Sequence, residues 1–317
     1  MTQAVGKADC LMDGDKSDHF GRNEAESTSR KEDKPGWLSV LMLSKTGLAG
    51  MVIVATVILV AIFAPVIAPH DPAAIDLASM FAPPMWLDGG SLSHPLGTDN
   101  LGRDVLSRIL YGSRTSLIVG VCAVIVAGCI GTLLGLIAGF YGGWVGNAIM
   151  RVTDSLLALP AMLIMLVIVG VFGPSLVTLI FVMGCTKWVP FTRLVRGEVL
   201  SLKERDYVRA AYSIGTPNAT IILRHLLLNV LSTIIVVSTL SVGTAIISES
   251  SLSFLGLGIQ PPDVSWGYML SEGQTHLSTS WWIATFPGVA LSLTVIGFIF
   301  LGDWLRDATD PRLQGRA

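Results

Sequence analysis

Charged residues are scarce in this chain. Among its 317 residues, 14% are charged and 51% are hydrophobic, whereas about 25% of the residues in an average soluble domain are charged. Residues 115–150 and 155–186 contain no Asp, Glu, Lys or Arg at all. Roughly 20 apolar residues are enough to cross the hydrocarbon of a bilayer as a helix. These gaps exclude an ordinary soluble domain and predict a polytopic protein that has the lipid bilayer around it.

Motifs for catalysis and cofactor binding are also missing. The chain has no GxxxxGK[ST] phosphate loop, no HExxH motif and no visible Ser-His-Asp arrangement. Its four cysteines give no disulfide framework, because three of them lie in apolar runs. We therefore expect no catalytic residue, no cofactor and no resident metal. The net charge of −2 gives no reason to expect a nucleic-acid partner.

The gaps between charges place the expected membrane spans. Backbone groups in lipid must be satisfied within the segment, so each span is expected to be a helix. No repeated ten-residue pattern of alternating hydrophobicity suggests a barrel. The predicted fold is all-α, with six transmembrane helices. The spans are expected at residues 47–67, 115–142, 147–172, 175–191, 226–248 and 281–302.

Basic residues predict the orientation of these spans. Seven Lys or Arg precede the first span, seven lie between residues 187 and 225, and none lies between residues 255 and 280. The positive-inside bias therefore predicts that both termini and the 192–225 loop are cytoplasmic. Arg103, Arg108 and Arg114 do not fit this count, because they fall in a segment assigned to the outside. We interpret that segment as amphipathic and interfacial.

Residues 1–44 precede the first span and have a different composition. Residues 1–36 lack an apolar core and mix eight acidic with six basic residues. This composition is typical of a disordered tail, here cytosolic, and not of a signal peptide. The membrane-embedded part of the chain is therefore expected to be residues 45–317.

The longest basic loop contains the stretch DYVRAAYSIGTPNATIILRHLLLN, residues 206–229. Ala210 and Ala211 favour a helix and leave a flat face, Gly215 permits a turn, and Pro217 can open a second helix. Two short helices around Gly215-Thr216-Pro217 are typical of a docking element for another protein. The alternative that physics alone leaves open is an ordinary amphipathic connector at the membrane interface.

Arg209-Ala210-Ala211, followed by Gly215 and Leu227, resembles the "EAA" loop of permeases of ATP-binding-cassette (ABC) importers. Two positions differ from that pattern, because Arg209 replaces the leading acid and Leu228 replaces a proline. Three further segments resemble the dipeptide, oligopeptide and nickel permease family, specifically its second, C-type subunit. They are HPLGTDNLGRDVLSRILYGSRTSL (94–117), ESSLSFLGLGIQPPDVSWGYML (249–270) and LGDWLRDATDPRL (301–313).

This resemblance implies a type I importer architecture in a bacterial cytoplasmic (inner) membrane. It implies four kinds of partner: a second homologous permease, two cytosolic ABC ATPases that bind the ATP, an extracytoplasmic solute-binding protein, and the bilayer. The solute would be a di- or oligopeptide or a related small solute. The coupling loop, about residues 192–225, would contact an ATPase through Arg209, Ala210, Ala211, Gly215, Thr216, Pro217 and Leu227.

Other polar and small residues are weaker candidates. Gly131, Gly135 and Gly139 recur every four residues and predict a close helix contact, while Pro160 and Pro287 are expected to kink their spans. Glu249 is the candidate for contact with the solute.

The chain also has histidines outside the expected spans. His70, His94 and His276, together with Asp71, have ligand chemistry for a metal such as nickel. Their irregular spacing favours ordinary loop histidines instead.

Two other classes of protein remain as alternatives. An ion-gradient-driven secondary transporter or channel usually shows inverted repeats or charges deep in the bilayer. A membrane-embedded enzyme needs polar catalytic groups gathered at one depth. Neither feature is visible in this sequence.

Overall fold

The computed structural model describes residues 44–309, and the regular structure of this part of the chain is helical throughout. The all-α fold is therefore confirmed. The expected tail lies outside the described residues apart from Ser44. The helices are α2 (Lys45–Ile67), η1 (Leu77–Ser79), α3 (Val105–Tyr141), α4 (Gly143–Leu157), α5 (Ala161–Phe172), α6 (Leu176–Lys203), α7 (Asp206–Ser213), α8 (Asn218–Thr220), η2 (Ile221–Leu226), α9 (Leu227–Phe254), α10 (Trp266–Gln274) and α11 (Trp282–Thr309).

Four helical segments among the described residues are long and apolar enough to cross a membrane. They are Lys45–Ile67, Val105–Tyr141, Asn218–Phe254 and Trp282–Thr309. The pair α4 and α5, bent by 85°, makes a fifth span if it is counted as one. The fourth expected span, residues 175–191, lies mainly in the first part of α6, which is not among these helices, so the predicted count of six spans is not confirmed for the described residues. Helix α6 is less apolar than the other four because it carries Lys187 and Arg193.

Helix α3 begins at Val105, ten residues before the expected second span at 115–142. Asp104 is its N-cap, and the Asp104 carboxylate accepts a hydrogen bond from the Ser107 backbone N–H at 2.8 Å. A cap of this kind satisfies one of the free N–H groups of the first helical turn. The charge gap located only the apolar part of this helix, since Arg108 and Arg114 lie inside its first turns.

Helix α6 also extends beyond its expected end. It continues to Lys203, so the first twelve residues of the expected 192–225 loop are helical. Thr192, Val195 and Val199 are buried along one face of this extension, and a helix with one such face is stabilised by packing. In the same way, α9 continues past residue 248 to Phe254 and α11 past residue 302 to Thr309.

The expected third span, residues 147–172, is interrupted at Pro160. Helices α4 and α5 meet there at 85°, and Pro160 is the N-cap residue of α5. Proline has no N–H to donate to the preceding turn, which explains the break. The prediction of a kink at Pro160 is confirmed, whereas Pro287 lies inside the uninterrupted helix α11.

Helices α3 and α6 pack closely along the small residues of α3. A Cβ atom on Gly135 would lie 2.7 Å from the Val195 Cβ, and one on Gly139 would lie 2.6 Å from the Val199 Cγ1. Both distances are too short for real carbon atoms, so α6 occupies the space that side chains at these positions would need. The Thr192 hydroxyl also donates a hydrogen bond to the Gly131 carbonyl at 3.1 Å. The predicted close contact is confirmed, and we call it the α3–α6 seam.

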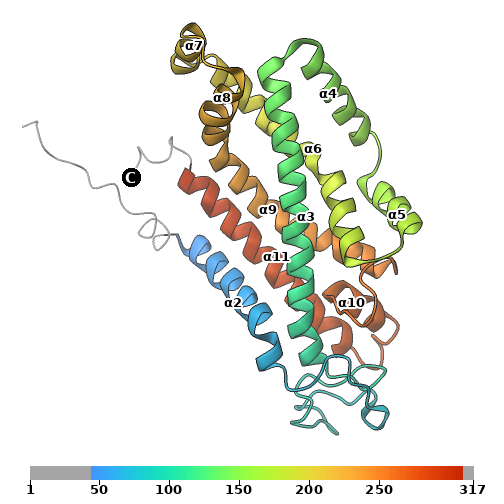
Figure 1. Cartoon of the computed structure of the whole chain (residues 1–317). Helices are drawn as coiled ribbons and strands as arrows, with labels where there is room; N and C mark the ends of the chain where they lie inside the picture. Colours follow the sequence, from blue (N-terminus) through green and yellow to red (C-terminus); the bar gives the residue numbers. More distant parts are fainter. Residues whose placement is uncertain (1–43, 310–317) are drawn as a thin grey trace, which may run out of the picture.

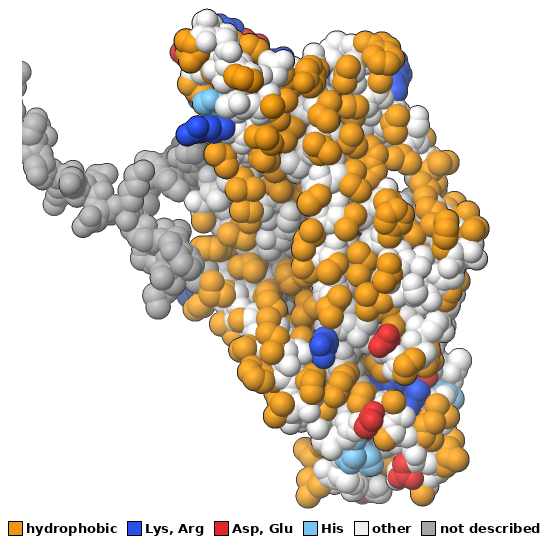
Figure 2. Space-filling model, viewed as in Figure 1, with side chains coloured by type: hydrophobic (Ala, Val, Ile, Leu, Met, Phe, Trp, Pro, Cys, Tyr) orange, Lys and Arg blue, Asp and Glu red, His pale blue; other side chains and the backbone are white. Residues whose placement is uncertain are grey.

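The bundle has two ends that differ in structure (Figure 1). Helices α7 and α8 lie at one end, beside the C-terminal end of α3, and we call this the α7 end. Helix α10 and the 68–104 segment lie at the other, the α10 end. Hydrophobic side chains cover most of the face between them (Figure 2). Such a band is what a bilayer-embedded protein presents to lipid.

The orientation across the membrane is tested with cysteines placed at the two ends. Ser213 in α7 and Ser278 before α11 are both exposed. In a variant without native cysteines, we expect Ser213→Cys to resist an impermeant thiol reagent in intact cells and to react after permeabilisation. Ser278→Cys should react in intact cells. The reverse pattern would place the α7 end outside.

Candidate functional site

Helix α7 turns one face toward the bundle and the other toward solvent. Val208 is fully buried and Ala211 is 6% exposed, while Arg209 and Ala210 are exposed. The two alanines therefore do not form one flat outer face. Only Ala210 is available to a partner, since Ala211 packs inward.

The turn after α7 has a definite hydrogen-bond pattern. The Thr216 N–H donates to the Ala211 carbonyl at 3.1 Å, and the Gly215 N–H donates to the Tyr212 carbonyl at 3.0 Å. This is a Schellman motif, which needs a residue with positive φ at the position of Gly215. Gly215 has φ +77°, and a Cβ atom there would meet nothing within 4 Å. Glycine is therefore required for its backbone conformation and not for space.

The chain leaves this turn as a nearly continuous helix. Pro217 is the N-cap of α8, and its carbonyl accepts hydrogen bonds from the N–H groups of Thr220 at 2.9 Å and Ile221 at 3.1 Å. A π-helical segment, η2, joins α8 directly to α9. Leu227 is the first residue of α9 and packs in part against the buried residues around it. Pro217 thus precedes the first helical residue.

A cluster of buried apolar side chains fixes α7 to the bundle. Fully burying one side chain of the size of Val208 contributes about 1.5–3 kcal/mol. The cluster draws on four helices and η2, so the α7 end forms one packed unit. We call it the α7 cluster, and its buried members are Leu136, Phe140, Val195, Val199, Val208, Ala211, Ile221, Leu226 and Val230.

Polar and aromatic contacts connect α6 and α7 to the last turn of α3. The Lys203 ammonium donates a hydrogen bond to the Phe140 carbonyl at 2.7 Å and lies 5.8 Å from the centre of the Phe140 ring. Tyr212 of α7 stacks on the same ring, with 5.9 Å between centroids. A cation near the free carbonyls of a helix C-terminus is favourable. Phe140 is therefore the point at which α3, α6 and α7 meet.

The outward face of α7 combines charge with exposed apolar side chains. Arg209 pairs with Glu204 within the chain, and both side chains are more than 60% exposed. An exposed pair contributes about 0–1 kcal/mol, so it barely restricts Arg209. Tyr207 and Tyr212 are more than 40% exposed and Ile214 is 81% exposed. Apolar groups gathered on a solvent face indicate a contact surface for another protein.

The α10 end is held by an ion-pair network. Arg103 Nε donates to Asp99 Oδ2 and Arg103 Nη2 to Glu272 Oε1, both at 2.7 Å. Arg108 pairs with Asp99 and donates from Nη2 to Glu272 Oε2 at 2.7 Å. Two positive and two negative charges therefore cancel, which explains how two arginines are accommodated at the end predicted to lie outside. The network fastens α10, through Glu272, to the start of α3.

Arg103 shows the electrostatic balance of this network. Burial lowers the pKa of the Arg103 guanidinium, but the carboxylates of Asp99 and Glu272 outweigh burial, so its pKa lies above the ordinary value. The guanidinium is therefore charged at every physiological pH. Sequence reasoning missed this network, because Glu272 lies far from Arg103 along the chain.

Of the four candidate metal ligands, the structure brings two together and places the other two elsewhere. His70 and His94 stack with 4.7 Å between ring centroids, and both approach Asp104. His276 packs instead against Phe81, with 4.9 Å between ring centroids. Asp71 accepts a hydrogen bond from a neighbouring backbone N–H and belongs to no such cluster among the described residues.

Glu249 lies in α9 with none of its surface exposed. The Ser253 hydroxyl donates to its carboxyl group at 2.6 Å, and the Ser250 hydroxyl lies at 3.4 Å. Buried polar groups are expected to be hydrogen-bonded in this way. Within the described part of the chain Glu249 reaches no solvent, so a contact with solute stays a prediction.

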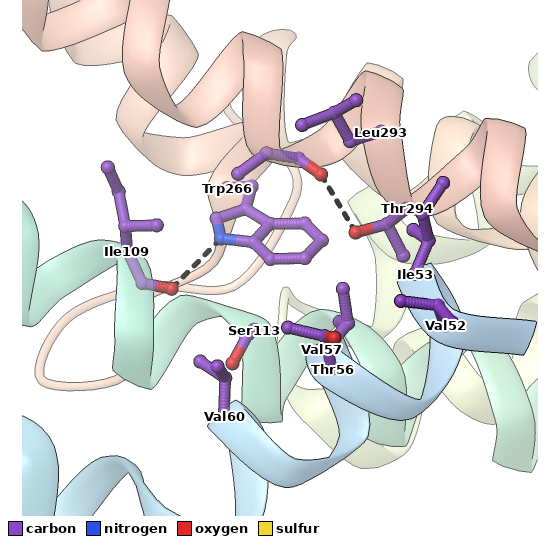
Figure 3. Close-up of a pocket in the computed structure, with 11 residues that line it drawn as sticks. Val52, Ile53, Thr56, Val57, Val60, Ile109, Ser113, Trp266, Leu293 and Thr294 are labelled. Atoms are coloured by element: carbon purple, nitrogen blue, oxygen red, sulfur yellow. Dashed lines mark hydrogen bonds between the residues drawn. The ribbon is translucent and has the colours of Figure 1, made fainter. Parts of the chain in front are cut away.

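A cavity of about 270 Å³ lies between α2, α3, α10 and α11 (Figure 3). Trp266 projects into it, and its indole N–H is satisfied by the Ile109 carbonyl at 3.0 Å. The Thr294 hydroxyl is likewise satisfied, because it donates to the Ala290 carbonyl at 2.8 Å. The remaining lining is mainly Val, Ile and Leu. Apart from the Thr56 hydroxyl, this cavity therefore has little to offer a polar solute.

Comparison with known families gives two matches along the chain. Residues 131–315 match the family described as "Binding-protein-dependent transport system inner membrane component". Residues 38–84 match the "N-terminal TM domain of oligopeptide transport permease C". The first match includes α6, α7, α9 and α11, and therefore the whole α7 end. The second includes α2.

Individual relatives align over most of their length. The di/tripeptide transport system permease protein DppC of Pseudomonas aeruginosa is 38% identical over 86% of this chain and 90% of its own. The dipeptide transport system permease protein DppC of Alkalihalophilus pseudofirmus is 42% identical over 86% and 88%. The glutathione transport system permease protein GsiD of Escherichia coli is 44% identical over 81% and 84%.

The ion-pair network at the α10 end predicts an effect on stability. Asp99→Asn keeps the size of the side chain but removes the negative charge that faces two guanidinium groups. Breaking a buried ion pair by removing one partner costs about 3–5 kcal/mol. We therefore expect a loss of about 3 kcal/mol in stability, measured as a lower thermal midpoint in nanodiscs. Asp88→Asn, in the exposed part of the same segment, is the control, and an equal effect of both would exclude a special role for the network.

Proposed function

The chain belongs to the family of binding-protein-dependent transport system inner membrane components, and we propose from this membership that it imports short peptides as the C-type permease of an ATP-driven transporter. The observation that carries the proposal is the agreement between relatives. Three that align over more than four fifths of this chain are named for the transport of di- or tripeptides or of glutathione. These solutes share a peptide-like backbone, which is the chemical class that we assign.

The chain acts within a complex and is not itself an enzyme. It is a multi-pass protein of the inner membrane, and its sequence contains no phosphate loop. We assign ATP hydrolysis to two cytosolic ABC ATPases and solute delivery to an extracytoplasmic binding protein. A second, homologous permease would complete the pathway. This division of labour fits a chain whose sequence contains no phosphate loop.

The α7 end is our candidate for the ATPase contact. Its outward face presents Ala210, the Arg209 guanidinium and the exposed side chains of Tyr207 and Ile214. An apolar or aromatic side chain that enters a pocket of the partner typically supplies much of the binding energy of an interface, and Tyr207 and Ile214 are side chains of this kind. The rim charge of Arg209 would then contribute to specificity.

The packing of the α7 end supports a mechanical role in coupling. A force applied to α7 reaches α3 and α6 through Phe140, Val199 and Val208, which are packed together in the α7 cluster. The α3–α6 seam continues that contact along the bundle. Since packed cores shift between discrete arrangements and do not deform continuously, movement of the ATPases would turn these helices as a unit.

The solute pathway is assigned to the interface with the second permease. The cavity of Figure 3 is largely apolar, and its Trp266, Thr294 and Ser113 groups are satisfied, so it offers a zwitterionic peptide few partners. A peptide backbone needs hydrogen-bonding groups when it leaves water. Glu249 remains the acidic candidate for such a contact, and its exposure would require α9 and α10 to separate.

The alternative from another class of protein is a transporter driven by an ion gradient. It is distinguished by uptake in proteoliposomes under an ion gradient, without ATP and without the ATPase subunits. In our proposal no uptake occurs under those conditions.

The proposed complex generates one prediction about its partners. When this chain is purified gently from its native membrane, we expect two ATPases and one non-identical permease to co-purify with it. Uptake of radiolabelled dipeptide by the reconstituted complex should require ATP on the side of the vesicle membrane where the ATPases lie. A stable homodimer that transports alone would contradict the assignment.

A second prediction separates coupling from folding at Gly215. Valine is β-branched and strongly disfavours positive φ, whereas asparagine tolerates it. No atom lies within 4 Å of the added Cβ, so a difference between the two variants reports backbone conformation alone. We expect Gly215→Val to insert normally but to lose at least tenfold in ATP-dependent uptake. Gly215→Asn should stay within about twofold of the original protein.

Three measurements are made on both variants: membrane level, ATPase co-purification and solute-stimulated hydrolysis. Normal uptake by the Gly215→Val variant would exclude the α7–α8 turn as a coupling element. Equal losses in both variants would point instead to a general loss of structure.

A further inference from the structure

Three side chains from separate segments converge at the α10 end. His70 follows α2, His94 lies in the segment before α3, and Asp104 is the N-cap of α3. One donor atom from each lies within 4.8 Å of the others. His94 Nδ1 is 3.1 Å from Asp104 Oδ1, and His70 Nδ1 is 4.0 Å from Asp104 Oδ2.

Asp104 and His70 are held in place by Ser107. The Ser107 N–H and hydroxyl both donate to Asp104 Oδ2, at 2.8 and 2.7 Å. The His70 backbone N–H donates to the Ser107 hydroxyl oxygen at 3.1 Å. Ser107 therefore orients the Asp104 side chain and fixes the backbone at His70. Partners of this kind commonly fix the direction of metal-ligating groups.

The arrangement leaves one nitrogen unsatisfied. His70 Nδ1 is shielded from solvent and has no hydrogen-bond partner among the described residues. It faces a carboxylate, and the His94 ring stacks beside it. In the tautomers that carry the ring proton on Nε2, both imidazole Nδ1 atoms face the Asp104 carboxylate, and a cation between them would stabilise this arrangement. A single proton serves His94 and Asp104 but leaves His70 Nδ1 without a partner.

We propose that His70, His94 and Asp104 bind a divalent transition-metal ion, with zinc as the ion that fits these ligands best. Two imidazoles and one carboxylate are typical zinc ligands and poor ligands for Ca²⁺ or Mg²⁺, which prefer oxygen. Zinc–ligand bonds of about 2.0–2.2 Å place neighbouring donors of a tetrahedral ion roughly 3.3–3.5 Å apart. The 3.1 and 4.0 Å separations lie on either side of this range but involve different Asp104 oxygens, and the donor atoms of the three residues lie up to 4.8 Å apart, so the side chains must draw together when the ion binds.

The site is closed toward the protein and open toward solvent. The Asp104 side chain is fully buried, that of His94 is 13% exposed, and that of His70 is 38% exposed. An ion can therefore enter beside His70, where a water molecule would complete its coordination. The bound ion fastens the chain after α2 to the N-terminus of α3. Its role is structural, and it is a separate ion from any transported solute.

Zinc binding is measured on the full-length chain in its purified complex, isolated through a tag without histidines. The sample is stripped with EDTA, loaded with zinc, freed of excess by gel filtration, and analysed by mass spectrometry for metal. We expect about one more zinc per chain than in a His70→Asn, His94→Asn double variant. Single variants His70→Asn and Asp104→Asn should lose at least tenfold in zinc affinity, since even indirect changes around a metal cost 10–100-fold.

Two controls separate binding from folding and from background. Asn at position 104 preserves the helix cap, so the thermal midpoint of Asp104→Asn without metal should stay near that of the original protein. His276→Asn changes a histidine at the same end outside the cluster and should retain full zinc binding. Added zinc should raise the thermal midpoint of the original protein and of His276→Asn, but not of His70→Asn.

The proposal is overturned if the original protein retains no more zinc than the double variant. It is also overturned if His276→Asn loses as much affinity as His70→Asn. In the first case the cluster is a hydrogen-bonded histidine–aspartate pair only. Neither result depends on the transported solute or on ATP, so the outcome is independent of the proposed transport function.

Discussion

The contact between α3 and α6 determines the arrangement of the rest of the molecule. Because Gly135 and Gly139 carry no side chain, α6 comes close enough for Val195 and Val199 to fill that space. This packing continues α6 far beyond the apolar segment, as a helix with one buried face. The end of α6 then sets where α7 begins, and so where the α7–α8 turn is presented. In lipid, where apolar attraction between helices is weak, such close packing is a main source of association.

The two ends of the bundle are stabilised by different interactions, which suits different tasks. At the α7 end, apolar side chains pack α7 against the ends of three longer helices and leave its outer face free. At the α10 end, Glu272 joins α10 to Arg103 and Arg108. Directional ion pairs fix α10 against the start of α3, whereas apolar packing joins α7 to the longer helices. This difference is consistent with an importer that receives force at one end and solute at the other.

Local sequence signals predicted much of this structure. The charge gaps, the glycine spacing and Pro160 are patterns among residues that are neighbours along the chain, so they can be recognised in the sequence alone. Helix ends were less predictable: α3 begins at the Asp104 cap, and its first turns bury Arg108, whose partner Glu272 is distant in sequence. The turn at Gly215 followed from local chemistry, but which of Ala210 and Ala211 faces outward depends on the bundle. The meeting of His70, His94 and Asp104 likewise follows only from the tertiary fold.

The central claim is that the outer face of α7 docks a cytosolic ATPase. A photo-crosslinking amino acid in place of Ile214, the C-cap residue of α7 and 81% exposed, tests it in living cells. Leu277 at the α10 end, 52% exposed, is the reference site. We predict a crosslink from position 214 to an ATPase subunit and none from position 277. The account is contradicted if position 214 yields no ATPase crosslink, or if position 277 yields one.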